Sequence, residues 1–207
     1  MSVKVKVCGV TNLPDALAAV EAGADVLGFM FYEQSPRCIS VPAAEEIIRQ
    51  LPPLVTKAGV FVNAPEDFVL RAIGDCGLDL LQFHGDETPR YCVQFGLMCM
   101  KAFRIRNAES LKALPDFPTD AWLLDVFVAD KFGGTGEKFN WDLAMEAKKF
   151  GRPIFLAGGL TPENVADAVR RVDPFGVDVS SGVESSPGRK DHAKLRAFIQ
   201  AVRGARR

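Results

Sequence analysis

The chain has 207 residues, of which 48% are hydrophobic, and its formal net charge is −1. That length can bury one full core, and no stretch rich in Pro, Gly or Ser divides it, so we expect one globular domain over residues 1–207. The near-neutral charge gives no electrostatic reason for a nucleic-acid or membrane partner. We find no signal-peptide pattern and no apolar run near the ~20 residues of a membrane span, so we expect a soluble, cytoplasmic protein.

The five cysteines are widely spaced, odd in number and without a C-x-x-C pair: Cys8, Cys38, Cys76, Cys92 and Cys99. This spacing argues against a disulfide framework and against structural zinc. Reduced, buried thiols are therefore expected at Cys76, Cys92 and Cys99. Cys8 differs from these because of its place in the first expected strand.

That first expected element is a strand over residues 3–8. The run VKVKVC alternates with period two, so its three valines share one face while Lys4, Lys6 and Cys8 share the other. A glycine turn follows, and then a helix over residues 13–22 with a polar capping residue before it and a glycine after it. Cys8 thus ends a strand directly before a turn, where an active-site residue would lie.

Further along the chain, strand-like and helix-like runs alternate almost without interruption. We expect strands at 3–8, 25–31, 55–62, 79–83, 98–103, 120–125, 153–157 and 175–179. We expect helices at about 13–22, 42–51, 65–75, 87–95, 107–113, 141–149, 162–171 and 191–203. Eight such repeats predict a parallel sheet closed into a (β/α)₈ TIM barrel with short loops. An open doubly wound sheet is the alternative, but it would normally carry fewer strands and a G-x-G-x-x-G fingerprint after the first.

Active sites of such barrels lie at the carboxyl ends of the strands, and the last two ends are rich in small residues. Gly158 and Gly159 follow the seventh strand, and Ser180, Ser181 and Gly182 follow the eighth, with a short helix possible at 182–186. Small residues let backbone N–H groups approach a phosphate oxygen closely. The alternative is that these glycines only form tight turns, but both loops belong to the usual phosphate site of this fold.

Two further strand ends offer acid–base chemistry. Asp125 ends an apolar strand, where partial desolvation favours the protonated carboxyl that a general acid needs. Cys8 could act as a thiolate base, helped by Lys6 on the same face. The plainer alternatives are a carboxylate that caps the next turn and an inert buried cysteine. Facing each other above a phosphate site, the two residues indicate proton transfer on a sugar phosphate.

A resemblance covers the whole chain, in order and with the family's spacing. Its motifs are KVCGVTN, GFMFYEQSPRCIS, GVFVN, LQFHGDE, LLDV, FGGTGEKFNW, LAGGLTPENV and GVDVSSGVESSPGRKD. Together they resemble the phosphoribosylanthranilate isomerase family of tryptophan biosynthesis. The resemblance implies an Amadori rearrangement of N-(5′-phosphoribosyl)anthranilate to 1-(o-carboxyphenylamino)-1-deoxyribulose 5-phosphate, with no metal and no organic cofactor.

The resemblance also implies roles for individual residues. Asp125 is similar to the family's general acid, which protonates the ribose ring oxygen, and Cys8 to the general base, which removes the C2′ proton. Arg37 resembles the residue that pairs with the anthranilate carboxylate, and His84 and Asp178 match positions lining the pocket. The resemblance also implies that the two loops described above bind the phosphate, through Gly158, Gly159, Ser180, Ser181 and Gly182.

Other functions remain open at this point. A metal-dependent epimerase would want a set of histidine ligands, yet the chain has only His84 and His192. A Schiff-base aldolase would want a lysine at a strand end, where neither Lys57 nor Lys101 is placed. Another phosphosugar enzyme and a catalytically silent phosphate-binding barrel are the remaining alternatives. The protein could be a monomer or a homodimer, and residues 132–136 are a candidate lid.

Overall fold

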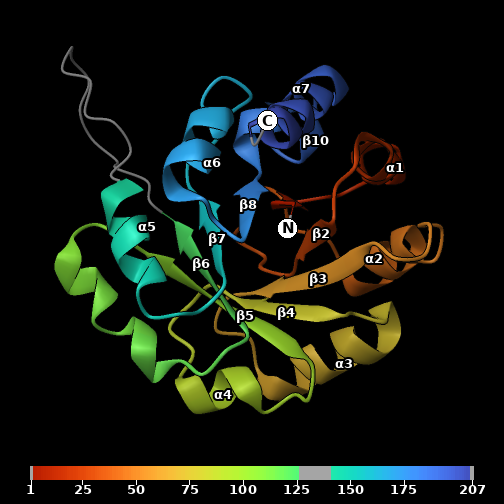
Figure 1. The fold of residues 1–207 in the computed structure, drawn as a ribbon. Helices are drawn as coiled ribbons and strands as arrows, with labels where there is room; N and C mark the ends of the chain where they lie inside the picture. Colours follow the sequence, from red (N-terminus) through yellow and green to blue (C-terminus); the bar gives the residue numbers. More distant parts are fainter. Residues whose placement is uncertain (1, 126–140, 206–207) are drawn as a thin grey trace.

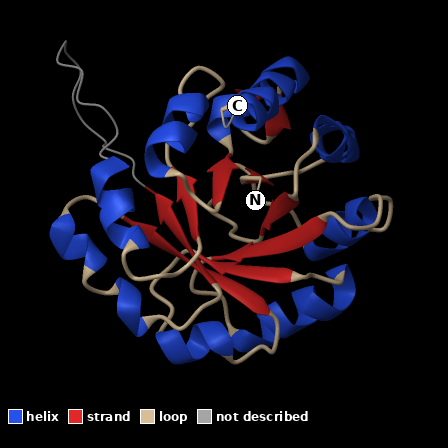
Figure 2. Cartoon of the chain, in the orientation of Figure 1, coloured by secondary structure: helices blue, strands red, loops and turns tan. Residues whose placement is uncertain are grey.

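The computed structural model describes residues 2–125 and 141–205, which form a closed barrel of parallel strands surrounded by helices (Figures 1 and 2). The strands are β1 (Lys4–Cys8), β2 (Val26–Met30), β3 (Thr56–Phe61), β4 (Leu80–Phe83), β5 (Met98–Arg104), β6 (Ala121–Asp125), β7 (Ile154–Ala157) and β8 (Gly176–Val179). Each pairs with the next in chain order, and β8 pairs with β1 in the register Lys6↔Asp178. The predicted TIM barrel is confirmed, and the open sheet is excluded.

The outer helices begin and end where local sequence favours it. They are α1 (Leu13–Ala22), α2 (Val41–Ile48), α3 (Glu66–Cys76), α4 (Pro89–Val93), α5 (Trp141–Lys148), α6 (Val165–Val172) and α7 (His192–Gly204). The side chain of Asn12 accepts a hydrogen bond from the N–H of Asp15 at the start of α1, and Gly23 ends that helix with φ of 101°. Ser40 and Thr88 cap α2 and α4 in the same way, each directly before the first helical residue.

The expected helix at 107–113 is wrong. Two short 3₁₀ helices follow β5 instead, η1 (Ala108–Leu111) and η2 (Leu114–Asp116). Asn107 and Ser110 form a capping box at the start of the first of them. Pro115 then prevents an α-helix from continuing, because it has no N–H to donate and its ring collides with the carbonyl four residues earlier.

The short helix considered at 182–186 is also wrong. After β8 comes a single 3₁₀ turn, η3 (Ser181–Val183), and then an antiparallel hairpin of β9 (Glu184–Ser186) and β10 (Arg189–Lys190). The tip of the hairpin holds Gly188 with φ of 76°, in the left-handed region that glycine adopts without strain. Thr11 donates a hydrogen bond to the Gly188 carbonyl at 2.5 Å, so the hairpin is docked on the connection between β1 and α1.

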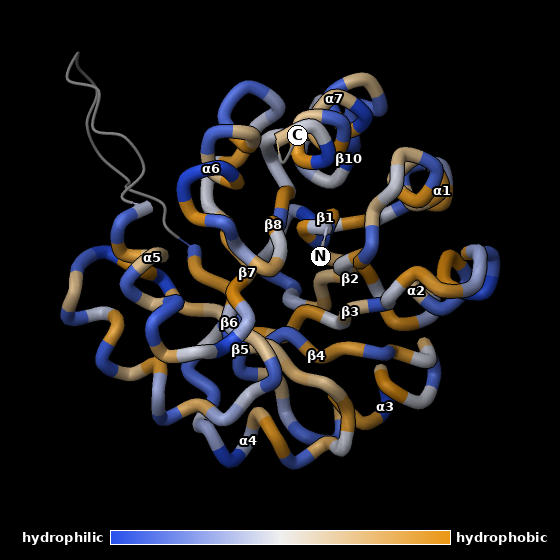
Figure 3. The backbone as a smooth tube through the Cα atoms, viewed as in Figure 1, coloured by the Kyte–Doolittle hydropathy of each residue, from blue (hydrophilic) through white to orange (hydrophobic). Residues whose placement is uncertain are grey.

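Strand alternation divides the buried apolar side chains into two clusters, one between strands and helices and one inside the barrel. Hydrophobic residues lie along both the strands and the helices (Figure 3). Val5 and Val7 point outward to the helices and are fully buried, whereas Lys6 and Cys8 point into the barrel, as the alternation predicted. The barrel interior is filled by Val26, Ala58, Leu80, Met100, Ala102, Ala121, Leu123, Phe155 and Ala157. Apolar side chains therefore fill much of the interior, and polar ones gather at the carboxyl ends of the strands.

Candidate active site

A cavity of about 400 Å³ opens at the carboxyl ends of the strands. Its walls come from the ends of β1, β4, β6, β7 and β8 and from the loop after β2. Each of the ten site residues expected from the sequence lines it: Cys8, Arg37, His84, Asp125, Gly158, Gly159, Asp178, Ser180, Ser181 and Gly182. The fold therefore brings together residues that lie up to 174 positions apart in the chain, at the rim where barrel enzymes carry their chemistry.

Cys8 and Lys6 share one small space inside the barrel. Lys6 has no exposed surface, and its ammonium donates a hydrogen bond of 2.8 Å to Oδ1 of Asp178 on β8. Gly28 on β2 leaves room for both side chains, since a Cβ there would lie 2.9 Å from the Cys8 Sγ and 3.1 Å from the Lys6 Nζ. Burial by itself would lower the pKa of Lys6, but Asp178 and Cys8 outweigh it and hold that pKa above its ordinary value. A positive charge thus lies beside the sulfur.

The loops after β7 and β8 approach each other closely. Gly158 and Gly159 have φ of 93° and 59°, and a Cβ on Gly182 would lie 1.9 Å from the Leu160 carbonyl oxygen. The Asn164 side chain holds the first loop by accepting from the Thr161 N–H and donating to the Gly159 carbonyl. In the second loop, the buried Ser180 Oγ has no hydrogen-bond partner among the described residues. That hydroxyl is available to a ligand oxygen.

His84 and Asp125 line the same cavity from the ends of β4 and β6. Asp125 is the last residue of β6 and is half-buried. Burial lowers the pKa of His84, although Asp125 and Asp178 act in the opposite direction, so the imidazole is neutral near pH 7. The Gln82 amide nitrogen lies 3.2 Å from Nδ1 of His84. With the Gln82 amide assigned in this orientation, its NH₂ donates to Nδ1, which assigns the ring proton to Nε2.

Comparison with known proteins identifies the family of this chain. Residues 5–201 match the family model for N-(5'phosphoribosyl)anthranilate (PRA) isomerase. The chain belongs to this family. The PRA isomerase of Geobacter sp. (strain M21) is 59% identical to it over 95% of the chain and 96% of that protein.

Solved structures of PRA isomerases show the same fold. The crystal structure of the enzyme from Thermotoga maritima is 41% identical, with a TM-score of 0.91, and covers 98% of this chain and 99% of its own. A PRA isomerase in complex with reduced 1-(o-carboxyphenylamino)-1-deoxyribulose 5-phosphate is 39% identical, with a TM-score of 0.89 and the same coverage. The resemblance expected from the sequence motifs is thereby confirmed.

Sequence reasoning placed Arg37 in the PRA isomerase pocket but missed its partner. The guanidinium is paired with Glu184, the first residue of β9, at 2.6 Å between Nη2 and Oε2. Gln82 beside His84, and Lys190 behind Cys8, were missed as well. A signal existed for each: Glu184 and Lys190 belong to the motif GVDVSSGVESSPGRKD, and Gln82 alternates with His84 along β4.

Three further expectations concern a metal site, a membrane span and a lid. Within residues 2–125 and 141–205, no group of three or more His, Cys, Asp or Glu side chains is arranged to hold a metal ion. No helix in this described part is long and apolar enough to span a membrane. The candidate lid at 132–136 lies outside the described residues.

Proposed function

We propose that this chain catalyses the Amadori rearrangement of N-(5′-phosphoribosyl)anthranilate to 1-(o-carboxyphenylamino)-1-deoxyribulose 5-phosphate, with Asp125 as general acid and Cys8 as general base. Membership of the PRA isomerase family supports the reaction, as does the relative crystallised with the reduced product. One observation carries the assignment of residues. Cys8 and Asp125 come from the ends of β1 and β6 and line the same cavity as the two small-residue loops.

Asp125 would begin the reaction by donating its proton to the ribose ring oxygen. As that proton arrives, the bond between C1′ and the ring oxygen breaks, and the nitrogen lone pair forms a C1′=N bond. The ring is then open, and the substrate is a protonated Schiff base. Such proton transfer by a positioned side chain typically accelerates a reaction by about 10²–10⁴-fold.

Cys8 would act in the second step as a thiolate. It removes the proton from C2′, and the electrons of that C–H bond form a C1′=C2′ bond while the C=N electrons return to nitrogen. The resulting enolamine becomes the ketose when its 2′ hydroxyl loses a proton and C1′ gains one. The Lys6 ammonium beside the sulfur places a positive charge where the thiolate is needed. Every step is a proton transfer or a bond shift within the substrate, so the proposal needs no metal or organic cofactor.

The two anionic ends of the substrate would be held on opposite sides of the reacting carbons. Backbone N–H groups and hydroxyls of the loops after β7 and β8 would bind the phosphate, with the Ser180 Oγ among them. Arg37 would pair with the anthranilate carboxylate, for which a guanidinium fork is suited. His84 and Asp178 would support the ribose, and the neutral imidazole can donate from Nε2.

The test is a fluorescence assay that follows the loss of freshly made phosphoribosylanthranilate. Wild type should turn the substrate over, and Cys8→Ser and Asp125→Asn should each lose about 10²–10⁴-fold in kcat while keeping the wild-type far-UV circular dichroism. Turnover by wild type with little loss in either variant would refute the residue roles alone. An inert wild type that still binds a phosphosugar would refute the reaction and favour another phosphosugar enzyme or a silent barrel.

A further inference from the structure

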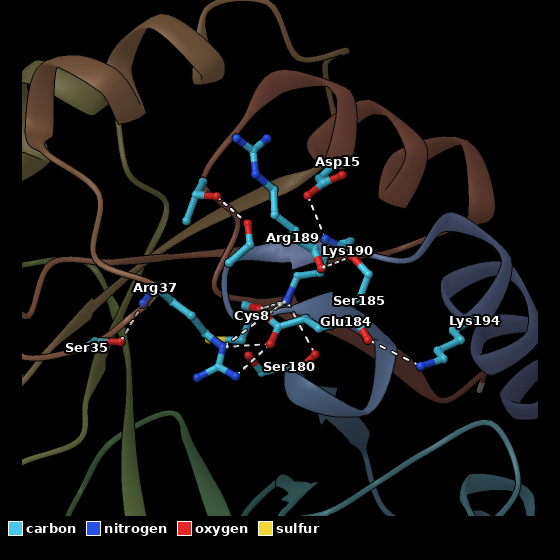
Figure 4. Close-up of polar contacts among 12 residues, drawn as sticks. Cys8, Asp15, Ser35, Arg37, Ser180, Glu184, Ser185, Arg189, Lys190 and Lys194 are labelled. Atoms are coloured by element: carbon cyan, nitrogen blue, oxygen red, sulfur yellow. Dashed lines mark hydrogen bonds and ion pairs between the residues drawn. The ribbon is translucent and has the colours of Figure 1, made fainter.

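Three charged side chains form a chain of contacts beside the cavity (Figure 4). Arg37 comes from the loop after β2, Glu184 opens β9 and Lys190 ends β10. The side chains of Glu184 and Lys190 are 4% and 0% exposed, whereas that of Arg37 is 22% exposed and reaches the cavity. The cluster therefore has an inner part shielded from water and one outer member that a ligand can meet.

Glu184 holds Arg37 through two donors of the guanidinium. Nε lies 2.9 Å from Oε1 and 3.1 Å from Oε2, and Nη2 lies 2.6 Å from Oε2. Two such parallel contacts fix the plane of a guanidinium as well as its position. Nη1 has no hydrogen-bond partner among residues 2–125 and 141–205, so it remains as a donor for an anion.

The aliphatic part of the Arg37 side chain, its stem, is positioned as tightly as the guanidinium. Gly9, which directly follows Cys8, has φ of 74°, and a Cβ there would lie 2.5 Å from the Arg37 Cδ. The arginine therefore packs on bare backbone immediately beyond the candidate base. Any shift of this stem changes the distance between the guanidinium and Cys8.

Lys190 links the same carboxylate to the strand that carries Cys8. Its Nζ lies 2.8 Å from Oε1 of Glu184, 2.6 Å from the Cys8 carbonyl oxygen and 3.4 Å from the Ser180 carbonyl oxygen. Its backbone N–H donates to Asp15 at 2.7 Å, which secures the hairpin from the other side. One buried ammonium thus connects Glu184, the end of β1 and the end of β8.

The charges of the cluster do not cancel. Burial would raise the pKa of Glu184, but hydrogen bonds from Arg37 and Lys190 outweigh it and hold that pKa below its ordinary value, so the carboxylate is ionised near pH 7. Two cations and one anion leave a net charge of +1 beside the cavity. Glu184 orients Arg37 without removing the attraction of the cluster for an anion.

We propose that Glu184 is a positioning residue, which holds the Arg37 guanidinium in the orientation that receives the substrate carboxylate. This rests on the proposed function of Arg37. If Glu184 only stabilised the fold, its substitution would change KM for all substrates alike. A positioning residue acts on the carboxylate alone and requires Arg37 to be present.

The test compares Glu184→Gln with wild type on two substrates, phosphoribosylanthranilate and its aniline analogue, which lacks the carboxylate. With the first, we expect KM to rise about tenfold, within the range of coupling between contacting residues, and kcat to stay within about twofold. With the analogue, wild type and Glu184→Gln should have the same KM. In an Arg37→Met background, Glu184→Gln should add no further change for either substrate.

Two more variants keep the test decisive. Glu184→Asp retains the charge but withdraws the carboxylate by one methylene, and we expect a folded protein with an intermediate rise in KM, even where Glu184→Gln fails to fold. Glu45→Gln breaks an exposed pair with Arg49 and should leave both substrates unaffected. Equal effects on both substrates, or an effect that persists without Arg37, would overturn the inference. A wild-type protein that does not turn over phosphoribosylanthranilate would instead refute the proposed function.

Discussion

The glycine at position 28 offers the sharpest test of how the candidate base is placed. In Gly28→Ala, the new Cβ would lie 2.9 Å from the Cys8 Sγ and 3.2 Å from the Cys8 Cα, where ordinary contacts begin at about 3.4 Å. The thiol, the Lys6 ammonium or β2 itself must move by several tenths of an ångström. Overpacking of this kind costs about 1–3 kcal/mol, which lowers Tm by roughly 2–12 °C in a domain of this size.

Catalysis should suffer as well as stability in this variant. Because displacement of a reacting group by about 1 Å can cost 10²-fold, we expect kcat to fall by roughly 10–100-fold in the phosphoribosylanthranilate assay. The matched control is Gly74→Ala, the same chemical change on the exposed side of α3, where a Cβ meets nothing within 4 Å. Here we expect a gain of about 0.5–1 kcal/mol from helix propensity and an unchanged kcat. A Gly28→Ala enzyme with wild-type kcat and Tm would refute this account of the site.

Three further predictions concern charge and burial. Lys6→Met leaves the Asp178 carboxylate without its buried partner, and we expect urea unfolding to show a loss of about 3–5 kcal/mol in the free energy of unfolding. The double variant Lys6→Met with Asp178→Asn should recover part of this loss. A loss under about 1 kcal/mol would contradict a stabilising Lys6–Asp178 ion pair. Burial would raise the pKa of Asp25, but Lys4, the Val5 N–H and Arg203 outweigh it and hold that pKa below its ordinary value, so the unfolded chain takes up this proton at a higher pH than the folded one. The stabilisation from Asp25 is therefore present above about pH 4 and is lost as pH falls through the folded pKa. In urea unfolding, Asp25→Asn should destabilise the protein at pH 7 and much less at pH 2. Equal losses of stability at both pH values would count against this role of Asp25. Burial raises the pKa of Cys76 and Cys99 to about 11 and that of Cys92 to about 12, so mass spectrometry should find these thiols unmodified by iodoacetamide at pH 8 until the protein is unfolded.

Much of the site could be predicted from the sequence because a parallel barrel turns local position into spatial proximity. Cys8, Asp125 and Asp178 each occupy the end or near-end of a recognisable strand, and all such ends meet at one rim. It was enough to find the strands, since the fold then assembled the cavity. The roles of these residues stay predictions until the variants are measured.

The partners of these residues could not be read from local pattern. Glu184 lies 147 positions from Arg37, and its contacts depend on a hairpin in a region where the sequence suggests a short helix. The Pro187-Gly188 pair was the available signal for a turn there. Similarly, Gly28 looks like any glycine within a strand, and its importance appears only when β1 is placed beside β2.

The pairing of β1 with β8 has a consequence for how the protein is made. A closed barrel has no edge strand, so β1 must wait for a partner that is encoded about 170 residues later. At ribosomal rates of about 5–20 residues per second, that interval is roughly 10–30 s, during which the charge of Lys6 has no Asp178 and the valines of β1 have no neighbour on one side. The Cys8 thiol, which we propose as the base, is therefore on a strand that is made long before β8, the second of its two partner strands. A nascent chain that stops short of β8 should hold β1 open, which makes activity a direct report of barrel closure.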